Sequence, residues 1–288
     1  MQQRNIIILL RVSAAAIFIS QAWECLRWHT KINNVLLDPQ RFGRILEWFY
    51  GTSLQEIYTS KMAEGAIVAA DNLMGVLCLG AAVATVFISS KFRFWKWFIY
   101  LGTGVLCLIC LAEFYDKNFR IGQLLEYSAR LSAPLFLVTS TRIHNSNHFI
   151  LLMKIAIGIT FIGHGLFAVG YYPQPGHFVD MMIKGFGMQE ELAKFLLIGF
   201  GVLDFLFAIA IFIPSITKPA LFYGIAWGFA TALARITTNF HFEFFENSLE
   251  QYLHEFMIRT PHFVLPLVLL ISGKKVDTTL FQSRGTGE

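Results

Sequence analysis

Long apolar stretches separated by short polar connections dominate this chain. About eight of them are long enough to cross the hydrocarbon core of a bilayer as helices. They cover residues 5–26, 62–90, 95–112, 121–140, 149–171, 190–214, 217–238 and 251–272. Backbone groups in lipid must be satisfied within the segment, and these stretches are too long for barrel strands. The pattern therefore predicts an all-α, multi-pass membrane protein.

A series of matched residues, most of them charged, follows the same order in the two halves of the chain. The matched pairs are Phe18/Phe161, Gly51/Gly187, Asp71/Asp204, Glu113/Glu243, Glu126/Glu255 and Arg130/Arg259. Because four spans return the chain to its starting side, the halves are predicted to be parallel repeats rather than inverted ones. We expect a first four-helix bundle at 1–140 and a second at 149–272. Residues 141–148 are the predicted linker, and 273–288 are a predicted cytoplasmic tail.

The charged residues predict an orientation. Of the 288 residues, 55% are hydrophobic and only 15% are charged, unlike a soluble domain. One set of connections is basic and contains Arg4, Lys91, Arg93, Lys96, Arg142, Lys218, Lys274 and Lys275. The other is acidic and contains Asp116, Asp180, Glu190, Glu191, Glu243, Glu246 and Glu250. The positive-inside rule then places both termini on the cytoplasmic side of what we expect to be a bacterial inner membrane. The sequence contains no basic patch suited to binding nucleic acid.

Two longer connections on the acidic side, 27–61 and 172–189, are predicted to be partly helical and amphipathic. Their apolar positions are Phe42, Ile45, Leu46, Trp48 and Phe49 in the first, and Phe178, Met181, Met182 and Ile183 in the second. Segments of this kind often lie in the membrane interface.

Charges inside the apolar stretches are candidates for a ligand-binding site. Glu126 and Arg130 stand four residues apart, as do their matched residues Glu255 and Arg259, so each pair is expected on one helix face. Arg235 belongs to the same layer near the acidic side. Buried charges in a membrane are costly and face the protein interior. The pairs either lock helices together or form a polar pocket whose arginines hold an anionic group.

Asp71 and Asp204 form a second candidate group, within the outer half of their helices. A carboxylate at this depth needs a cation, a hydrogen-bond donor or a proton. The arginine of the same half is the expected partner, which would pair Asp71 with Arg130 and Asp204 with Arg259. These aspartates either hold helices together or form a proton or ligand site.

Metal and redox chemistry are further alternatives. Carboxylates and imidazoles that could bind zinc, iron or manganese cluster in the second half, at His241, Glu246, Glu250 and His254. No recognised metal signature is present, so a solvated acidic face is the alternative. Cys107 and Cys110 form a Cys-x-x-Cys that could undergo thiol–disulfide exchange, although cysteine is also a common small apolar residue in helices.

The plan of each half resembles the DoxX-like family of small four-helix membrane proteins. The likeness rests on a basic residue near the start of the first helix, small residues further along it, a glycine after the amphipathic segment and a carboxylate within the second helix. These residues are Arg11 and Lys154; Gly158, Gly163 and Gly165; Gly51 and Gly187; and Asp71 and Asp204. The chain departs from the family in fusing two units and in having aspartate where glutamate is more usual. Some members are linked to thiosulfate:quinone oxidoreductases or other membrane redox complexes.

The leading functional hypothesis is a DoxX-like component of a membrane redox complex that binds a small or lipidic molecule, with a quinone as a candidate. Other membrane or periplasmic proteins are its expected partners. The alternatives are a transporter of a small anion or metal ion, and a structural or assembly subunit. The sequence has no phosphate-binding glycine loop, no dinucleotide fingerprint and no Gly-x-Ser-x-Gly elbow, which excludes an ATPase or a soluble-type dehydrogenase. Whether the protein is an enzyme is left open.

Overall fold

The computed structural model describes residues 2–28, 30–36, 38–40, 43–88, 94–143 and 146–273. Every regular element in these ranges is a helix, as predicted. The elements are α1 Gln2–Arg27, α2 Ile32–Leu36, α3 Gly43–Tyr50, α4 Leu54–Thr59, α5 Lys61–Phe87, α6 Trp95–Asp116, α7 Ile121–Glu126, α8 Ser128–Ile143, α9 Asn147–Ala168, α10 Gly176–Phe186, α11 Glu190–Ala210, α12 Thr217–Thr237, the short 3₁₀ helix η1 Phe242–Phe244, α13 Phe245–Met257 and α14 Pro261–Ser272. Phe42, the basic turn at 89–93, linker residues 144–145 and the tail after Gly273 lie outside the described residues.

Six of the described helices are long and apolar enough to cross a membrane, namely α1, α5, α6, α9, α11 and α12. A seventh span is obtained if 242–257 and α14, which meet at a bend of 43°, count as one broken crossing. The prediction of a multi-pass helical membrane protein therefore agrees with the structure at this level. The remaining predicted span, 121–140, which is the fourth along the chain, is not a single helix.

Helix α9 accounts for the interruption of the segment 121–140, which is divided into α7 and α8. The Ala129 N–H does not continue the helical ladder but donates a hydrogen bond of 2.9 Å to Thr160 Oγ1 of α9. Gly163 of α9 passes so close to α7 that a Cβ there would lie 2.7 Å from the backbone nitrogen of Glu126. The remaining helix, α8, has 16 residues, which is short for a straight crossing.

A second break separates α13 from α14 at residues 258–260, and Pro261 begins α14. Thr260 keeps helical angles, φ −52° and ψ −35°, but Pro261 has no backbone N–H with which to continue the helical ladder. Helix α1 contacts this break, since the Ser13 and Thr260 hydroxyl oxygens lie 3.5 Å apart. Each predicted Glu/Arg pair therefore spans a helix break rather than a continuous helical face.

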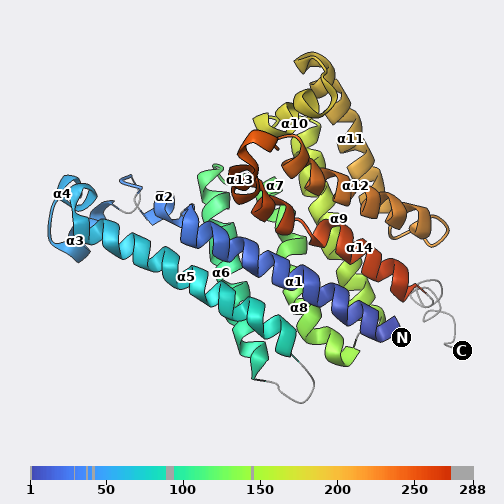
Figure 1. The fold of residues 1–288 in the computed structure, drawn as a ribbon, viewed down its shortest axis with the longest axis horizontal. Helices are drawn as coiled ribbons and strands as arrows, with labels where there is room; N and C mark the ends of the chain where they lie inside the picture. Colours follow the sequence, from blue (N-terminus) through green and yellow to red (C-terminus); the bar gives the residue numbers. More distant parts are fainter. Residues whose placement is uncertain are drawn as a thin grey trace, which may run out of the picture.

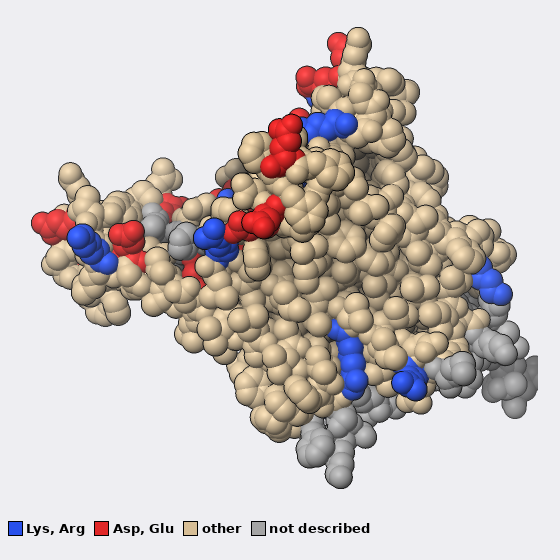
Figure 2. All heavy atoms as spheres, viewed as in Figure 1, with Lys and Arg blue, Asp and Glu red and all other residues tan. Residues whose placement is uncertain are grey.

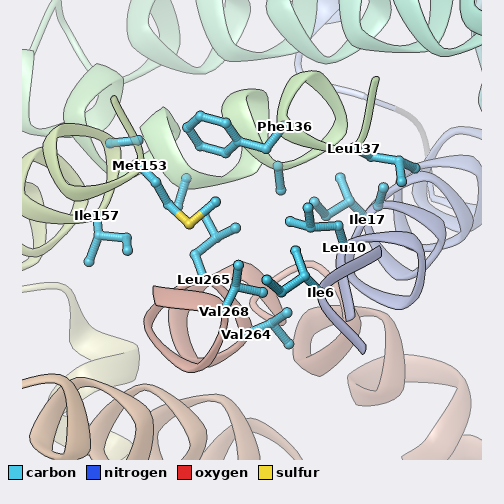
Figure 3. Packing of buried hydrophobic residues seen from close by; sticks show 14 of the residues in the cluster. Ile6, Leu10, Ile17, Phe136, Leu137, Met153, Ile157, Val264, Leu265 and Val268 are labelled. Carbon is cyan, nitrogen blue, oxygen red and sulfur yellow. The ribbon is translucent and has the colours of Figure 1, made fainter. Parts of the chain in front are cut away.

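The largest hydrophobic core lies where four helices meet, two from each half of the chain (Figure 3). Its members include Ile6, Leu10 and Ile17 of α1, Phe136 and Leu137 of α8, Met153 and Ile157 of α9, and Val264, Leu265 and Val268 of α14. Helices in a bilayer are held together by close van der Waals packing rather than by water exclusion. This shared core therefore holds the two halves against each other.

The remaining helices surround this core (Figure 1). Helix α5 packs along α1, α11 along α9, and α12 against α13 and α14. Helix α10 contacts both α11 and α12, whereas α3 and α4 extend away from the body of the molecule (Figure 1). The start of α1 lies beside the end of α14, because the Gln2 side chain donates a hydrogen bond to the Ile271 carbonyl.

Charged residues are unevenly distributed on the face drawn in Figure 2. Acidic and basic side chains lie together over the ends that carry α3, α4, α10 and α13, whereas the coloured charged side chains beside the chain termini on this face are all basic (Figures 1 and 2). The wide area between these two margins is almost free of charge (Figure 2). An uncharged belt between two charged margins is the surface expected of a protein that spans a bilayer.

Candidate ligand-binding site

A polar cavity of about 350 Å³ lies where α6, α7, α8, α10 and the two helix breaks come together. Five of its lining side chains carry positive charge and only Glu113 and Glu126 carry negative charge. The cations are Lys117, Arg120, Arg130, Arg235 and Arg259. Arg130 follows the first break and Arg259 lies within the second, so both breaks direct an arginine to one cavity.

Arg130 is the least compensated of these cations. Its surface is only 7% exposed, and its guanidinium lies over the Tyr127 ring at 4.6 Å from the ring centre. Its Nε atom has no hydrogen-bond partner, and no carboxylate in the described part of the chain forms an ion pair with it. A cation–π contact offsets only part of the cost of burying a charge.

Arg235 and Arg259 share a single carboxylate. Glu255 Oε2 lies 3.4 Å from Arg235 and 3.8 Å from Arg259. Arg259 also donates a hydrogen bond of 2.9 Å to the Glu255 carbonyl across the break. Arg235 is 6% exposed, lies over the Phe178 ring at 5.5 Å and has no partner for its Nε atom. The predicted Glu255/Arg259 pair is thus present, but Arg235 takes the shorter contact.

Glu126 pairs with His164 of α9 rather than with Arg130. The distance from His164 Nδ1 to Glu126 Oε1 is 3.0 Å. The His262 ring lies 5.0 Å from that of His164, and its Nδ1 atom lies 2.9 Å from the Arg259 carbonyl oxygen. Since His164 lies mid-helix, sequence analysis could place it in the membrane but could not predict that it would occupy the carboxylate nearest to Arg130.

A second, apolar cavity of about 340 Å³ adjoins the first, between α9, α10, α11 and α12. Its wall includes Phe161, Met182, Leu197, Phe200 and Trp227, and the last two rings stack at 4.3 Å. Four residues line both cavities, namely His164, Phe178, Arg235 and Arg259. A cationic chamber and an aromatic chamber therefore share one wall.

Helix α10 covers both cavities. Phe178, Met181 and Met182, which the amphipathic pattern identified, face the apolar cavity. His177 lies exposed at the mouth of the polar cavity. Surrounding protein atoms remove part of its hydration, and the charges of Arg235 and Arg259 add to this effect, so the pKa of His177 is lowered.

The two predicted aspartates lie in different surroundings. Asp204 lines the apolar cavity, where the Tyr223 hydroxyl lies 3.4 Å from its Oδ1 atom. Asp71 is fully buried and accepts a hydrogen bond of 2.8 Å from Thr30, away from both cavities. The expected arginine partners instead line the polar cavity. The structure thus gathers Glu126, Arg130, Asp204, Arg235 and Arg259 around the two cavities, with Glu255 bonded to the arginines.

The predicted metal and redox residues lie elsewhere. His241, Glu246, Glu250 and His254 are spread from the α12–α13 connection along α13, and Glu250 forms an ion pair of 2.5 Å with Arg27. No group of three or more histidine, cysteine or acidic side chains in the described ranges could hold a metal ion. Cys107 and Cys110 are free thiols on α6, the first exposed and the second buried, and neither lines a described cavity.

Sequence reasoning missed several residues of the site. Lys117 and Arg120 follow α6 in a turn where Asn118 and Phe119 adopt positive φ angles of 54° and 58°. This turn directs the chain into α7 at the cavity mouth. The charges themselves were visible in the sequence, but their convergence with Arg235 and Arg259 depends on contacts between distant helices.

Comparison of the chain with protein-family models, with curated proteins and with solved structures gave no match.

Proposed function

We propose that this protein binds one amphiphilic molecule of the membrane, with its polar head among the arginines and its apolar part between α11 and α12. The observation that carries this proposal is the shared wall of the two cavities, which joins a cationic chamber to an aromatic one. Each volume falls in the range typical of sites for small molecules. A free ion would use only the first chamber, and an alkane only the second.

The packing of the helices supports access for such a molecule. Helix α11 packs mainly on α9, and α12 mainly on α13 and α14. Helices α11 and α12 contact each other less extensively, through rings such as Phe200 and Trp227, and both line the apolar cavity. Helix α10 then covers the opening, and its amphipathic pattern suits a position in the membrane interface. A quinone fits this class, because its ring oxygens can accept hydrogen bonds from arginine and histidine while its tail occupies apolar space. Membership of a membrane redox complex is the wider role that the DoxX-like resemblance implies.

We further propose an inner-membrane location with both termini in the cytoplasm. The margin beside the termini carries only basic side chains on this face, and the acidic side chains are confined to the opposite, mixed margin, which supports this orientation (Figure 2). The site then opens toward the periplasmic side, because the polar cavity lies at the ends of α6 and α12 that are remote from the termini.

A two-unit, DoxX-like architecture remains part of the proposal. Helices α1, α5 and α6 are followed by the broken pair α7–α8, and α9, α11 and α12 by the broken pair α13–α14. The matched glycines Gly51 and Gly187 both have left-handed φ angles, of 68° and 65°, directly after an amphipathic helix. These parallels support a duplication in which the chain crosses the membrane four times per half, with α7–α8 as a broken crossing.

Native mass spectrometry of the full chain, released from mild neutral detergent, tests the proposed function. We expect one amphiphile per chain, identified by its mass. The variant Ala234→Phe should abolish the adduct, because Ala234 lines the apolar cavity on α12 and the ring would fill it. Ala226→Phe is the matched control, since Ala226 is exposed on the same helix and outside the cavity. A bare chain, or an adduct kept by Ala234→Phe, would contradict the proposal and favour an assembly subunit.

A further inference from the structure

We infer that the head of the bound amphiphile is an oxyanion, a phosphate or carboxylate, which Arg130, Arg235 and Arg259 hold together. This inference rests on the proposed function and specifies the chemistry of its ligand. It starts from the unequal numbers of buried positive and negative groups around the polar cavity.

The carboxylates nearest to the arginines are already engaged or shared. Glu126 is engaged by His164 at 3.0 Å, and Glu255 is divided between two arginines at 3.4 and 3.8 Å. Arg130, although 7% exposed, forms no ion pair within the described ranges. Buried charges in membrane proteins are paired or serve function. Glu113 also lines the cavity and attracts Arg130 electrostatically, but it forms no ion pair with Arg130 in the described part of the chain. With five cations and only two carboxylates in its lining, the cavity is suited to an additional anion that the chain itself does not supply.

Three arginines from separate parts of the chain converge on the polar cavity. Arg130 comes from the start of α8, Arg235 from the end of α12 and Arg259 from the α13–α14 break, yet all three line one cavity. Each guanidinium offers a planar set of donors that suits the oxygens of phosphate or carboxylate. Lys117 and Arg120 stand at the mouth, where they attract an anion from the aqueous side. A neutral head such as a quinone ring would leave these charges unpaired.

The apolar cavity offers space for a hydrocarbon chain attached to the anion. Arg235 and Arg259 line both cavities, so an anion held between them lies directly beside the chamber formed by Phe200 and Trp227. An oxyanion attached to a hydrocarbon chain fills both spaces. A free phosphate would fill the polar cavity alone and gain nothing from the aromatic wall.

The test is a titration of the full chain in neutral detergent with three probes, followed by isothermal calorimetry. The probes are dodecyl phosphate, inorganic phosphate and the neutral amphiphile decylubiquinone. We expect dodecyl phosphate to bind tighter than either of the others by about tenfold or more, because charge-assisted hydrogen bonds form only with its head and apolar contacts only with its tail. Arg130→Gln and Arg235→Gln should each weaken dodecyl phosphate about tenfold or more and weaken decylubiquinone by a clearly smaller factor, because a neutral acceptor gains less from a guanidinium than an anion does.

Arg44→Gln is the matched control, because Arg44 is exposed on α3 and lies outside both cavities. If a buried variant fails to purify as a monodisperse protein, Lys117→Gln provides the same comparison at the exposed mouth. Equal binding of both amphiphiles, unaffected by the arginine variants, would overturn the oxyanion inference and leave the amphiphile site standing. Equal binding of inorganic and dodecyl phosphate would overturn the amphiphile site and favour a small-anion transporter. Binding of none of the probes would overturn both proposals.

Discussion

The substitution Arg130→Met provides the sharpest test of whether this buried arginine serves a ligand or the fold. Methionine replaces the long apolar stem of arginine but removes the charge, so packing is largely kept. If the site is empty, the charge of Arg130 is a net cost to the folded protein, because no carboxylate of the described chain pairs with it. Removing an uncompensated charge should then stabilise the ligand-free protein.

The magnitude follows from two opposing contributions. Effective burial of one ion costs several kcal/mol, which water inside a cavity of about 350 Å³ reduces. The contact of Arg130 with the Tyr127 ring returns about 1–2 kcal/mol. We therefore expect Arg130→Met to raise the free energy of unfolding by about 1–2 kcal/mol, or the midpoint of thermal unfolding by about 2–6 °C.

The matched comparison is Arg235→Met, made at an equally buried arginine of the same cavity that does have a carboxylate partner, Glu255. Because Glu255 is partly exposed and retains Arg259, this change should lower the unfolding free energy by about 0–1 kcal/mol. Thermal unfolding of delipidated protein in neutral detergent, followed by intrinsic fluorescence, measures both. If Arg130→Met destabilised the protein as much as Arg235→Met, Arg130 would be a structural residue and the argument from missing partners would be wrong.

Three further outcomes test the structure around the site. Gly163→Ala should lower the free energy of unfolding by about 1–3 kcal/mol in the same thermal assay, because its Cβ would lie 2.7 Å from the backbone of α7. The control is Gly199→Ala on α11, which should be neutral or stabilising because the space around Gly199 is open. Thr160→Val should cost about 1 kcal/mol in chemical denaturation, because it removes the hydroxyl that accepts the hydrogen bond from the α8 backbone; no loss would show that the break does not depend on this bond. Because the pKa of His177 is lower in the folded protein, the unfolded chain binds more protons below pH of about 6.5. The free energy of unfolding should therefore fall as the pH decreases below this value. Its slope against pH should be smaller in His177→Gln, and an unchanged slope would show that His177 is not a source of this pH dependence.

The sequence was sufficient to predict features that depend on composition and local pattern. Long apolar stretches implied membrane helices, and the amphipathic pattern around Phe178 and Met182 identified the helix that covers the site. Buried arginines were recognisable because charges are rare and costly in such stretches. What could not be predicted were contacts between distant segments. The break after Glu126 depends on Thr160 and Gly163 of α9, and neither residue is a helix breaker in the α7–α8 sequence itself.

The same limitation explains the pairing of the carboxylates. Spacing predicted Glu126 with Arg130, and membership of the same half predicted Asp71 with Arg130. The structure instead provides His164 as the partner of Glu126 and Thr30 as a donor to Asp71. A mid-helix histidine has no fixed partner in sequence, since its neighbours are decided by how helices pack. The error is informative, because Arg130 is consequently left without an ion pair among the described residues.

The two matched Glu-x-x-x-Arg segments thus have different roles around one site. A helix break inside a membrane protein leaves backbone groups without helical partners, which is tolerated where protein or a polar cavity satisfies them. In the first half, α9 closes the break and Glu126 pairs with His164, so that Arg130 forms no ion pair in the described part of the chain and could bind the proposed ligand. In the second half, Glu255 stays with Arg235 and Arg259, and α10 covers the adjoining apolar cavity. Helices α3 and α4, which occupy the corresponding place in the first half, extend away from the body (Figure 1). A duplicated framework would in this way give one composite site rather than two equal ones, with the free cation contributed by one half and the apolar chamber by the other.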